Sequence, residues 1–368
     1  MRKIKVAQVL TKGADSGTEV VVRNYCQALG NRVDWLILIE NECRVLNEKV
    51  VSDFGGKLFL IPPYSHFLSY EKRLKEIFLT EKPDIVHANL STVSFAPLMA
   101  AKKAQVPVRI AHSHTMASPG EGMRNVLKKI FRKWTMHYCN DYFCCSQEAG
   151  EFQFGKRVDK KDLFLLPNAF PKGAFSFSEE ARREVRERHG LSDDCLILGF
   201  VGRLERQKNP LFLIDVLKEL RIPSVLLVLG EGSMKEEMES KAKSTNVDVR
   251  FCGTTTDVSS YYSAMDILLA PSLFEGFGNV VLEGQASGMD VLLSENFPKS
   301  VCLEERICHV CPLDASFWAK EITYLWEERK KVPLAERRKE SKSLDLYDID
   351  KAKERLLKRY QDDLERLL

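Results

Sequence analysis

The chain has 368 residues, enough for two domains of ordinary size. Hydrophobic residues make up 44% of it and charged residues 29%, the usual proportions in a globular protein. A net charge of +3 is too small to indicate binding to nucleic acid. The apolar runs are shorter than the roughly 20 residues of a membrane-spanning helix. We therefore expect a globular protein that neither crosses a membrane nor binds nucleic acid.

The ten cysteines have no regular spacing. This argues against a disulfide scaffold and against a zinc site of paired Cys-x2-Cys motifs. We interpret Cys144 and Cys145, and the loose group Cys302, Cys308 and Cys311, as small buried apolar residues. The N-terminus enters a strand without the apolar segment of a signal peptide. Together these features predict a cytoplasmic protein.

The first half of the chain alternates apolar strands with helical segments. The predicted strands are residues 4–10, 35–39, 57–61, 83–88, 107–112, 142–146 and 163–166, and helices are predicted at residues 20–29 and 94–103. This alternation is typical of a doubly wound parallel sheet. In the polar loop 11–19, Gly17 would allow a phosphate or sugar to approach the backbone, and a plain tight turn is an equal alternative. The spacing does not match the Gly-x-Gly-x-x-Gly fingerprint of dehydrogenases.

Two histidines follow one of these strands, at residues 112 and 114. Ligands of open parallel sheets bind beyond the carboxyl ends of the strands, so this position favours a functional role for His112 or His114. A satisfied core histidine is the alternative. No carboxylate cluster lies near them in the sequence to complete a metal site.

Residues 124–134 predict a basic amphipathic helix. Its apolar positions recur at helical spacing and basic residues fill most of the others: Val126, Leu127, Ile130, Phe131 and Trp134 against Arg124, Lys128, Lys129, Arg132 and Lys133. Such a helix suits an anionic membrane surface. The alternative is an ordinary helix that packs on the core and turns its basic side to solvent.

The strand–helix alternation starts again after the turn-forming residues 167–171. The predicted strands of the second half are residues 195–201, 225–229, 249–253 and 266–270. We therefore divide the chain into a first domain, a second domain and a final helix: residues 1–170, 171–345 and 346–368.

Several loops of the second half carry residues suited to a nucleotide. Arg203 and Lys208 follow the strand at 195–201, and such a cationic pair can neutralise a diphosphate. A solvated cluster of surface charge is the alternative. Gly232 lies in a turn after the next strand, and the loop leaving Gly253 could meet a nucleotide base.

The segment 271–288 combines a strand end, a glycine loop and a helix start. Gly276 and Gly278 permit a sharp turn, and the helix N-terminus offers N–H groups and a positive dipole end to an anion. Glu275 and Glu283 frame the loop, and carboxylates suit sugar hydroxyls. The combination predicts a nucleotide-sugar pocket, whereas a surface loop with two solvated glutamates is the plain alternative.

These motifs resemble the family 4 retaining glycosyltransferases of the GT-B fold. The resemblance rests on the sequences of residues 201–209, 274–278 with Glu283, and 285–288. Other segments are similar to bacterial capsular and exopolysaccharide enzymes: residues 109–114, 144–149, Asn168 after its proline, and 295–298. The resemblance covers almost the whole chain.

The resemblance implies a fold of two facing Rossmann-like domains, each a doubly wound parallel sheet. The first would bind mainly the acceptor and the second the nucleotide sugar. The final helix would cross back onto the first domain.

The resemblance also implies catalytic roles. Arg203 and Lys208 would hold the donor diphosphate and stabilise the leaving group, and Glu275 would bind hydroxyls of the donor sugar. His112 or His114 would lie beside the reacting sugar. No metal or other cofactor is expected, because cationic side chains and a helix end would do the work of a metal.

Glu283 would bind the ribose hydroxyls of the donor. The other implied donor-binding positions are Gly17, Gly202, Gly232, Gly253, Thr254, Gly276, Phe277, Gly278, Asn279 and Val280. Three residues depart from the family pattern: Ser16 and Ala169 stand where glycine is commoner, and Asp290 where proline usually follows. None of these changes removes a charged residue of the implied site.

We therefore expect a retaining hexosyltransferase that moves a sugar from a nucleotide-sugar donor, expected to be UDP-linked, to a polysaccharide or lipid-linked saccharide. It would work in cell-surface polysaccharide synthesis, peripherally at the inner face of the membrane. A nucleotide-sugar epimerase of the same fold and a degenerate partner subunit are the alternatives.

Overall fold

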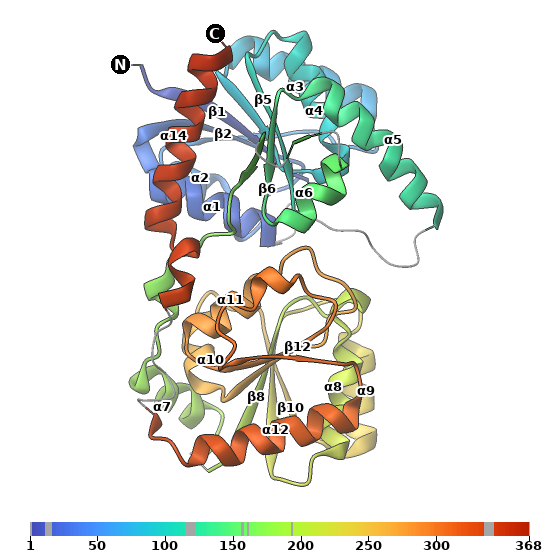
Figure 1. The fold of residues 1–368 in the computed structure, drawn as a ribbon, viewed down its shortest axis with the longest axis vertical. Helices are drawn as coiled ribbons and strands as arrows, with labels where there is room; N and C mark the ends of the chain where they lie inside the picture. Colours follow the sequence, from blue (N-terminus) through green and yellow to red (C-terminus); the bar gives the residue numbers. More distant parts are fainter. Residues whose placement is uncertain are drawn as a thin grey trace. The chain divides into compact units, whose positions relative to one another are not determined.

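The computed structural model describes residues 2–11, 17–114, 122–155, 158–159, 162–192, 194–334 and 342–367. It divides the chain into two compact units (Figure 1). The first unit is Met1–Pro171 with Leu346–Leu368, and the second is Lys172–Asp345. Each is built around one parallel sheet, so the predicted α/β fold with two Rossmann-like domains is confirmed.

The first unit has a seven-stranded sheet in the order β3-β2-β1-β4-β5-β6-β7. Its strands are β1 (Ile4–Val9), β2 (Val33–Ile39), β3 (Lys57–Leu60), β4 (Ile85–Ala88), β5 (Val108–Ser113), β6 (Asp141–Cys144) and β7 (Leu163–Leu165). Every pairing between them is parallel. The strand order changes direction between β1 and β4, which makes this the switch point of the sheet.

Helices cover both faces of this sheet. They are α1 (Gly17–Leu29), α2 (Glu48–Asp53), α3 (Phe67–Glu81), α4 (Phe95–Lys103), α5 (Gly122–Tyr138), α6 (Gln147–Phe154) and α14 (Ile349–Leu367). Successive strand residues point to opposite faces, so Val6 of β1 joins the core beneath α1, α2 and α14, while Ala7 joins the core beneath α3 and α4. Among the described residues, no helix is both long and apolar enough to cross a bilayer.

The C-terminal helix α14 packs on α1 and completes the first unit (Figure 1). Ala352, Leu356 and Tyr360 recur at intervals of one helical turn and are buried in its core. On the same helix, Asp363 lies among charged groups with Arg359 and Asp141. Burial, together with the hydrogen bond and the charge of the neighbouring Asp141, raises the pKa of Asp363 to about 8.

The second unit has a six-stranded sheet in the order β10-β9-β8-β11-β12-β13, again with every pairing parallel. Its strands are β8 (Leu196–Val201), β9 (Ser224–Leu229), β10 (Val249–Gly253), β11 (Ile267–Ala270), β12 (Asp290–Ser294) and β13 (Cys308–Cys311). Its helices are α7 (Glu179–Arg188), α8 (Pro210–Glu219), α9 (Lys235–Thr245), α10 (Val258–Ala264), α11 (Asn279–Ala286) and α12 (Ala315–Lys330). The switch point lies between β8 and β11.

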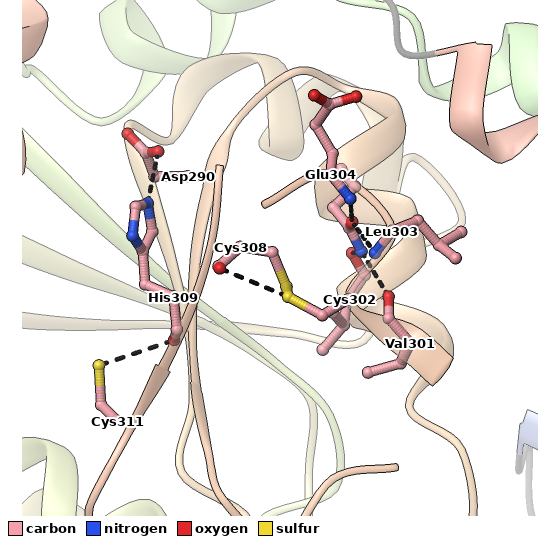
Figure 2. The surroundings of a disulfide bond; sticks show 10 residues. Asp290, Val301, Cys302, Leu303, Glu304, Cys308, His309 and Cys311 are labelled. Atoms are coloured by element: carbon pink, nitrogen blue, oxygen red, sulfur yellow. Dashed lines mark hydrogen bonds and ion pairs between the residues drawn. A yellow bond between two sulfur atoms is a disulfide. The ribbon is translucent and has the colours of Figure 1, made fainter. Parts of the chain in front are cut away.

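Cys302 forms a disulfide with Cys308, the first residue of β13 (Figure 2). The interpretation of these two as small apolar residues outside any disulfide is therefore wrong, whereas Cys144, Cys145 and Cys311 are buried free thiols. Irregular spacing could not reveal the bond, because the fold of this segment brings the two Cα atoms to 5.7 Å. Gln285 of α11 holds the same segment by accepting hydrogen bonds from the N–H groups of Leu303 and Glu304, each at 3.0 Å.

Asp290, one of the residues that depart from the family pattern, has specific partners in the structure. Asp290 is buried at the start of β12, where its carboxylate forms an ion pair with Arg329 of α12. His309 of β13 also lies 3.0 Å from it (Figure 2). The carboxylate thus links two neighbouring strands to a helix, a role that a proline ring could not fill.

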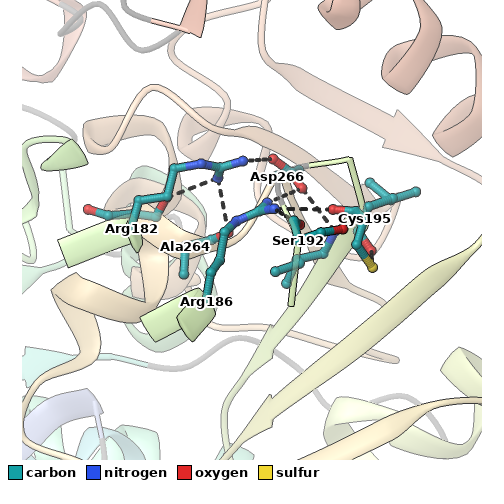
Figure 3. A network of polar contacts seen from close by, with 9 residues as sticks. Arg182, Arg186, Ser192, Cys195, Ala264 and Asp266 are labelled. Carbon is teal, nitrogen blue, oxygen red and sulfur yellow. Dashed lines mark hydrogen bonds and ion pairs between the residues drawn. The ribbon is translucent and has the colours of Figure 1, made fainter. Parts of the chain in front are cut away.

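A second buried carboxylate, Asp266, ties α7 to the sheet (Figure 3). Its two oxygens accept hydrogen bonds from Arg182 at 3.0 Å and Arg186 at 2.7 Å, both from α7. It also accepts from the backbone N–H of Ile197 in β8 at 2.9 Å. All three side chains are at most 6% exposed, so their charges depend on one another rather than on water.

Replacing Asp266 by alanine should strongly destabilise the second unit, because two guanidinium groups would stay buried without their counter-charge. We expect the free energy of unfolding to fall by about 3–5 kcal/mol, measured by denaturant titration. The matched control is Asp215→Ala, which breaks the exposed pair with Lys241 and should cost under about 1 kcal/mol. Equal losses in the two variants would contradict this account.

Candidate active site

The predicted donor-binding residues gather at one edge of the second unit. The loops after β8, β9, β10 and β11 all leave the carboxyl edge of a parallel sheet, next to its switch point. They carry the predicted residues Gly202, Arg203, Lys208, Gly232, Gly253, Thr254, Glu275, Gly276, Phe277 and Gly278, and α11 follows with Asn279, Val280 and Glu283. Arg203 and Thr254 are exposed there, and Phe277 is buried.

Two glycines let the loop after β9 pack its backbone against the backbone of the loop after β8. Gly230 has φ +142°, and a Cβ atom there would lie 1.9 Å from the carbonyl oxygen of Gly202. A Cβ on Gly232 would lie 2.4 Å from the carbonyl oxygen of Leu204. No other residue fits either position, because a real Cβ does not approach backbone so closely. Gly230 was not among the predicted site residues, although the turn that contains it was.

The carboxylate of Glu205 joins the loops after β8 and β9. It accepts hydrogen bonds from the backbone N–H of Ser233 at 3.1 Å and from its hydroxyl at 2.8 Å. These bonds, with a smaller contribution from the charge of Arg203, lower the pKa of Glu205. No sequence pattern indicated this link, since a glutamate in a charged loop is ordinary.

Lys208 and Glu275, predicted separately, form an ion pair through Nζ and Oε1. Glu275 is only 7% exposed, and the hydroxyl of Ser272 donates a second hydrogen bond to Oε1 at 3.1 Å. Gln207 fastens the two loops together: its carbonyl accepts from the N–H of Leu273 at 2.8 Å, and its side chain donates to the carbonyl of residue 274 at 3.0 Å. The loops after β8 and β11 are therefore held as one unit.

Helix α11 begins at Asn279, shortly after Glu275 in the chain. Gly278 caps the helix with φ +106°, and a Cβ there would lie 2.5 Å from the ring of Phe297. Because the helix begins at the carboxyl edge of the sheet, its positive dipole end points to the same edge as Lys208. A cation and a helix N-terminus together form a site for a doubly charged anion such as a diphosphate.

Glu283 lies in the second turn of α11. Its Oε2 accepts a hydrogen bond from the hydroxyl of Tyr262 in α10 at 2.8 Å. Burial and the adjacent carboxylate raise the pKa of Tyr262, which stays a neutral donor. Tyr262 therefore orients Glu283, and the sequence did not identify it.

Gly17 is the first residue of α1. Residues 12–16 of its predicted loop, including Ser16, lie outside the described residues, as do the side chains of Arg124, Lys128 and Lys129 on α5. Ala169, the third departure, is fully buried, and its carbonyl accepts a hydrogen bond from Asn24 at 3.1 Å.

In the first unit, the predicted histidines belong to a buried polar network at the switch point. His112 of β5 lies 3.0 Å from His87 of β4, from Nδ1 to Nε2. The other nitrogen of His87 lies 2.7 Å from the hydroxyl of Tyr360 in α14. That hydroxyl accepts a hydrogen bond from Gln8 of β1 at 3.1 Å. His87 was not among the predicted site residues, although it lies in a predicted strand.

The network continues to the second predicted histidine. Asn89 donates to the side-chain oxygen of Gln8 at 2.8 Å, and its own oxygen lies 3.1 Å from Nε2 of His114. The rings of His112 and His114 lie 3.9 Å apart between centroids. Within the described residues, Nε2 of His112 and Nδ1 of His114 are buried atoms without a hydrogen-bond partner.

Burial keeps these histidines neutral. It lowers the pKa of His87 and of His114 to about 3 and that of His112 well below its ordinary value. The imidazoles are therefore core groups, yet two of their nitrogens have no hydrogen-bond partner among the described residues. Within the described residues, no group of three or more His, Cys, Asp or Glu is placed to hold a metal ion.

Because folding depresses these pKa values, the first unit should lose stability as the pH falls below about 6.5. The unfolded chain then binds protons that the folded chain rejects, at a cost of about 1–2 kcal/mol per histidine between pH 7 and pH 5. Denaturant titrations at both pH values should show a smaller loss for His114→Gln than for wild type. The same change at exposed His137 is the control. Identical pH dependence in all three proteins would show that His114 is not held neutral.

Comparisons with known proteins agree with this geometry. Residues 16–171 match the family model "Glycosyltransferase Family 4", and residues 195–328 match "Glycosyl transferases group 1". The chain is 30% identical over 311 residues to EpsF of Bacillus subtilis, named as a glycosyltransferase, covering 81% of this chain and 80% of that protein.

Two further proteins are similar. An Escherichia coli protein named UDP-Gal:alpha-D-GlcNAc-diphosphoundecaprenol alpha-1,3-galactosyltransferase is 26% identical, covering 82% of this chain and 81% of its own length. The structure of Anabaena HepE in complex with UDP-glucose superposes with a TM-score of 0.85 at 15% identity, over 98% of this chain and 100% of the other. The fold is thus that of GT-B proteins, and the chain belongs to the family 4 glycosyltransferases, a family of hexose-transferring enzymes.

Proposed function

We propose that the chain transfers a hexose from a UDP-linked donor to a lipid-linked saccharide, with retention of the anomeric configuration. The observation that carries this proposal is the Lys208–Glu275 pair, held at the switch point beside the N-terminus of α11. A cation suited to a diphosphate and a carboxylate suited to sugar hydroxyls are in contact there. A nucleotide sugar joins these two chemical groups in one molecule.

The names of the relatives support the choice of donor and acceptor. The Escherichia coli relative is named for UDP-galactose and an undecaprenol-linked saccharide. HepE of Anabaena was solved with UDP-glucose. We propose the same classes of donor and acceptor for this chain, in the synthesis of a cell-surface polysaccharide.

Departure of the UDP leaves negative charge on the diphosphate, so groups that stabilise this charge lower the barrier. Arg203, Lys208 and the N-terminus of α11 would do so without a metal. Glu275 would accept hydrogen bonds from donor-sugar hydroxyls, and Glu283, oriented by Tyr262, from the ribose.

Lys208→Ala should lower turnover of the donor by roughly 10²- to 10³-fold, because one preorganised electrostatic contact is lost. The measurement is UDP release from UDP-glucose and UDP-galactose, with and without a lipid-linked acceptor, and it should be insensitive to EDTA. Lys241→Ala removes an ion-paired lysine elsewhere in the same unit and should leave turnover unchanged. A folded Lys208→Ala protein with full activity would refute the assignment.

We also propose that α5 attaches the enzyme to an anionic membrane surface at the cytoplasmic face, where a lipid-linked acceptor would be found. Ile130 and Trp134 are 42% and 50% exposed, and Lys133 is exposed beside them. Large exposed apolar side chains next to lysine suit the boundary of a bilayer. Arg132 of the same helix donates to the carbonyl of Gln153 at 2.8 Å, so we leave it out of the charge change below.

Changing Lys128, Lys129 and Lys133 to glutamine should weaken binding to vesicles that contain anionic lipid. Each basic residue near such a surface contributes about 1 kcal/mol. Sedimentation with vesicles of phosphatidylglycerol and phosphatidylcholine measures the effect. The control removes the same charge from α9 through Lys235, Lys241 and Lys243. Equal binding by both triple variants would indicate that α5 is an ordinary surface helix.

A further inference from the structure

The hydrogen bonds around Tyr360 have a direction. The amide nitrogen of Gln8 can only donate, so the oxygen of Tyr360 accepts from it at 3.1 Å. The single hydroxyl proton then points to Nδ1 of His87, 2.7 Å away. The reverse arrangement, in which His87 donates to Tyr360, would leave the hydroxyl proton buried without an acceptor, which is costly.

This direction fixes the proton positions of both imidazoles. With Nδ1 of His87 accepting, its one proton lies on Nε2 and is donated to Nδ1 of His112 at 3.0 Å. The proton of His112 therefore lies on its own Nε2. Nε2 is also the atom of His112 that lacks a partner among the described residues, so His112 presents a free N–H donor.

His114 presents a hydrogen-bond acceptor where His112 presents a donor. Asn89 uses its nitrogen to donate to Gln8, so its oxygen accepts from Nε2 of His114. His114 then has an unprotonated Nδ1, the atom left without a partner in the described structure. The two neighbouring rings, tilted by 40° to one another, thus offer one donor and one acceptor, as a sugar hydroxyl requires.

We propose that Tyr360 of the C-terminal helix is a positioning residue that sets the tautomer of His112 through His87. The helix would then contribute to the reaction and not only to the stability of the first unit. This inference rests on the proposed function insofar as His112 is to meet a sugar. The tautomer itself does not depend on any substrate.

Nitrogen-15 spectra of histidine-labelled, ligand-free protein test the tautomer directly, because protonated and unprotonated imidazole nitrogens have well-separated shifts. Wild type should show His112 protonated at Nε2. Tyr360→Phe should give a mixture of tautomers at His87 and His112. The matched control is Tyr25→Phe, which removes another buried hydroxyl of this unit, bonded to the carbonyl of Pro167 at 2.7 Å, and should leave both shifts in place.

Kinetics test the consequence. With UDP-glucose or UDP-galactose as donor, Tyr360→Phe should lower kcat by about 10- to 100-fold with little change in KM, as expected when the partner orienting an imidazole is lost. In a double-mutant cycle, Tyr360→Phe should cost nothing further in a His87→Phe background, because its effect passes through His87. This comparison remains decisive even where both variants are less stable.

Additive losses in that cycle, or an unchanged His112 spectrum in Tyr360→Phe, would overturn the proposal. So would a shifted tautomer with undiminished kcat. The wild type could turn over no nucleotide sugar while Tyr360→Phe still shows the tautomer change. That result would contradict the proposed function but support the role of Tyr360 in setting the tautomer of His112.

Discussion

The reversal of strand order at the centre of each sheet is the constraint on which the rest depends. At β8 and β11, as at β1 and β4, the chain leaves the carboxyl edge and turns to opposite faces of the sheet. The loops on the two sides of the switch point therefore diverge, and polar groups lie between them. On one side of the switch point, Gly230 approaches the backbone of Gly202 because the adjacent strands β8 and β9 end side by side.

The two units bury their polar groups in different ways. In the second unit, charge is kept and balanced: Glu275 by Lys208, and Asp266 by two arginines. In the first unit, burial instead keeps His87, His112 and His114 without charge. A charged edge suits a diphosphate and a neutral edge suits hydroxyls, which agrees with the division of donor and acceptor that the family resemblance implies.

The C-terminal helix illustrates how a distant segment completes a site. Its apolar stripe places it on α1, and that packing carries Tyr360 to the switch point of a sheet formed by the first half of the chain. Arg359 and Asp363 of the same helix bind Asp141 of β6, and these contacts hold the helix in place. Loss of this helix would leave His87 and Gln8 without their shared partner.

The sequence by itself determined the two parallel sheets, except for the strands β12 and β13, and also the glycine loops, because these depend on local periodicity and backbone freedom. It also identified Lys208, Glu275, His112 and His114 as polar residues at strand ends. It could not show that Lys208 touches Glu275, 67 positions away, or that His87 touches Tyr360, 273 positions away.

The same limit explains the correction at Cys302 and Cys308. A local pattern encodes which face of an element is apolar and where the chain can turn. The choice of partner for a buried charge, imidazole or thiol is made by strand order and packing, and only the tertiary structure contains these.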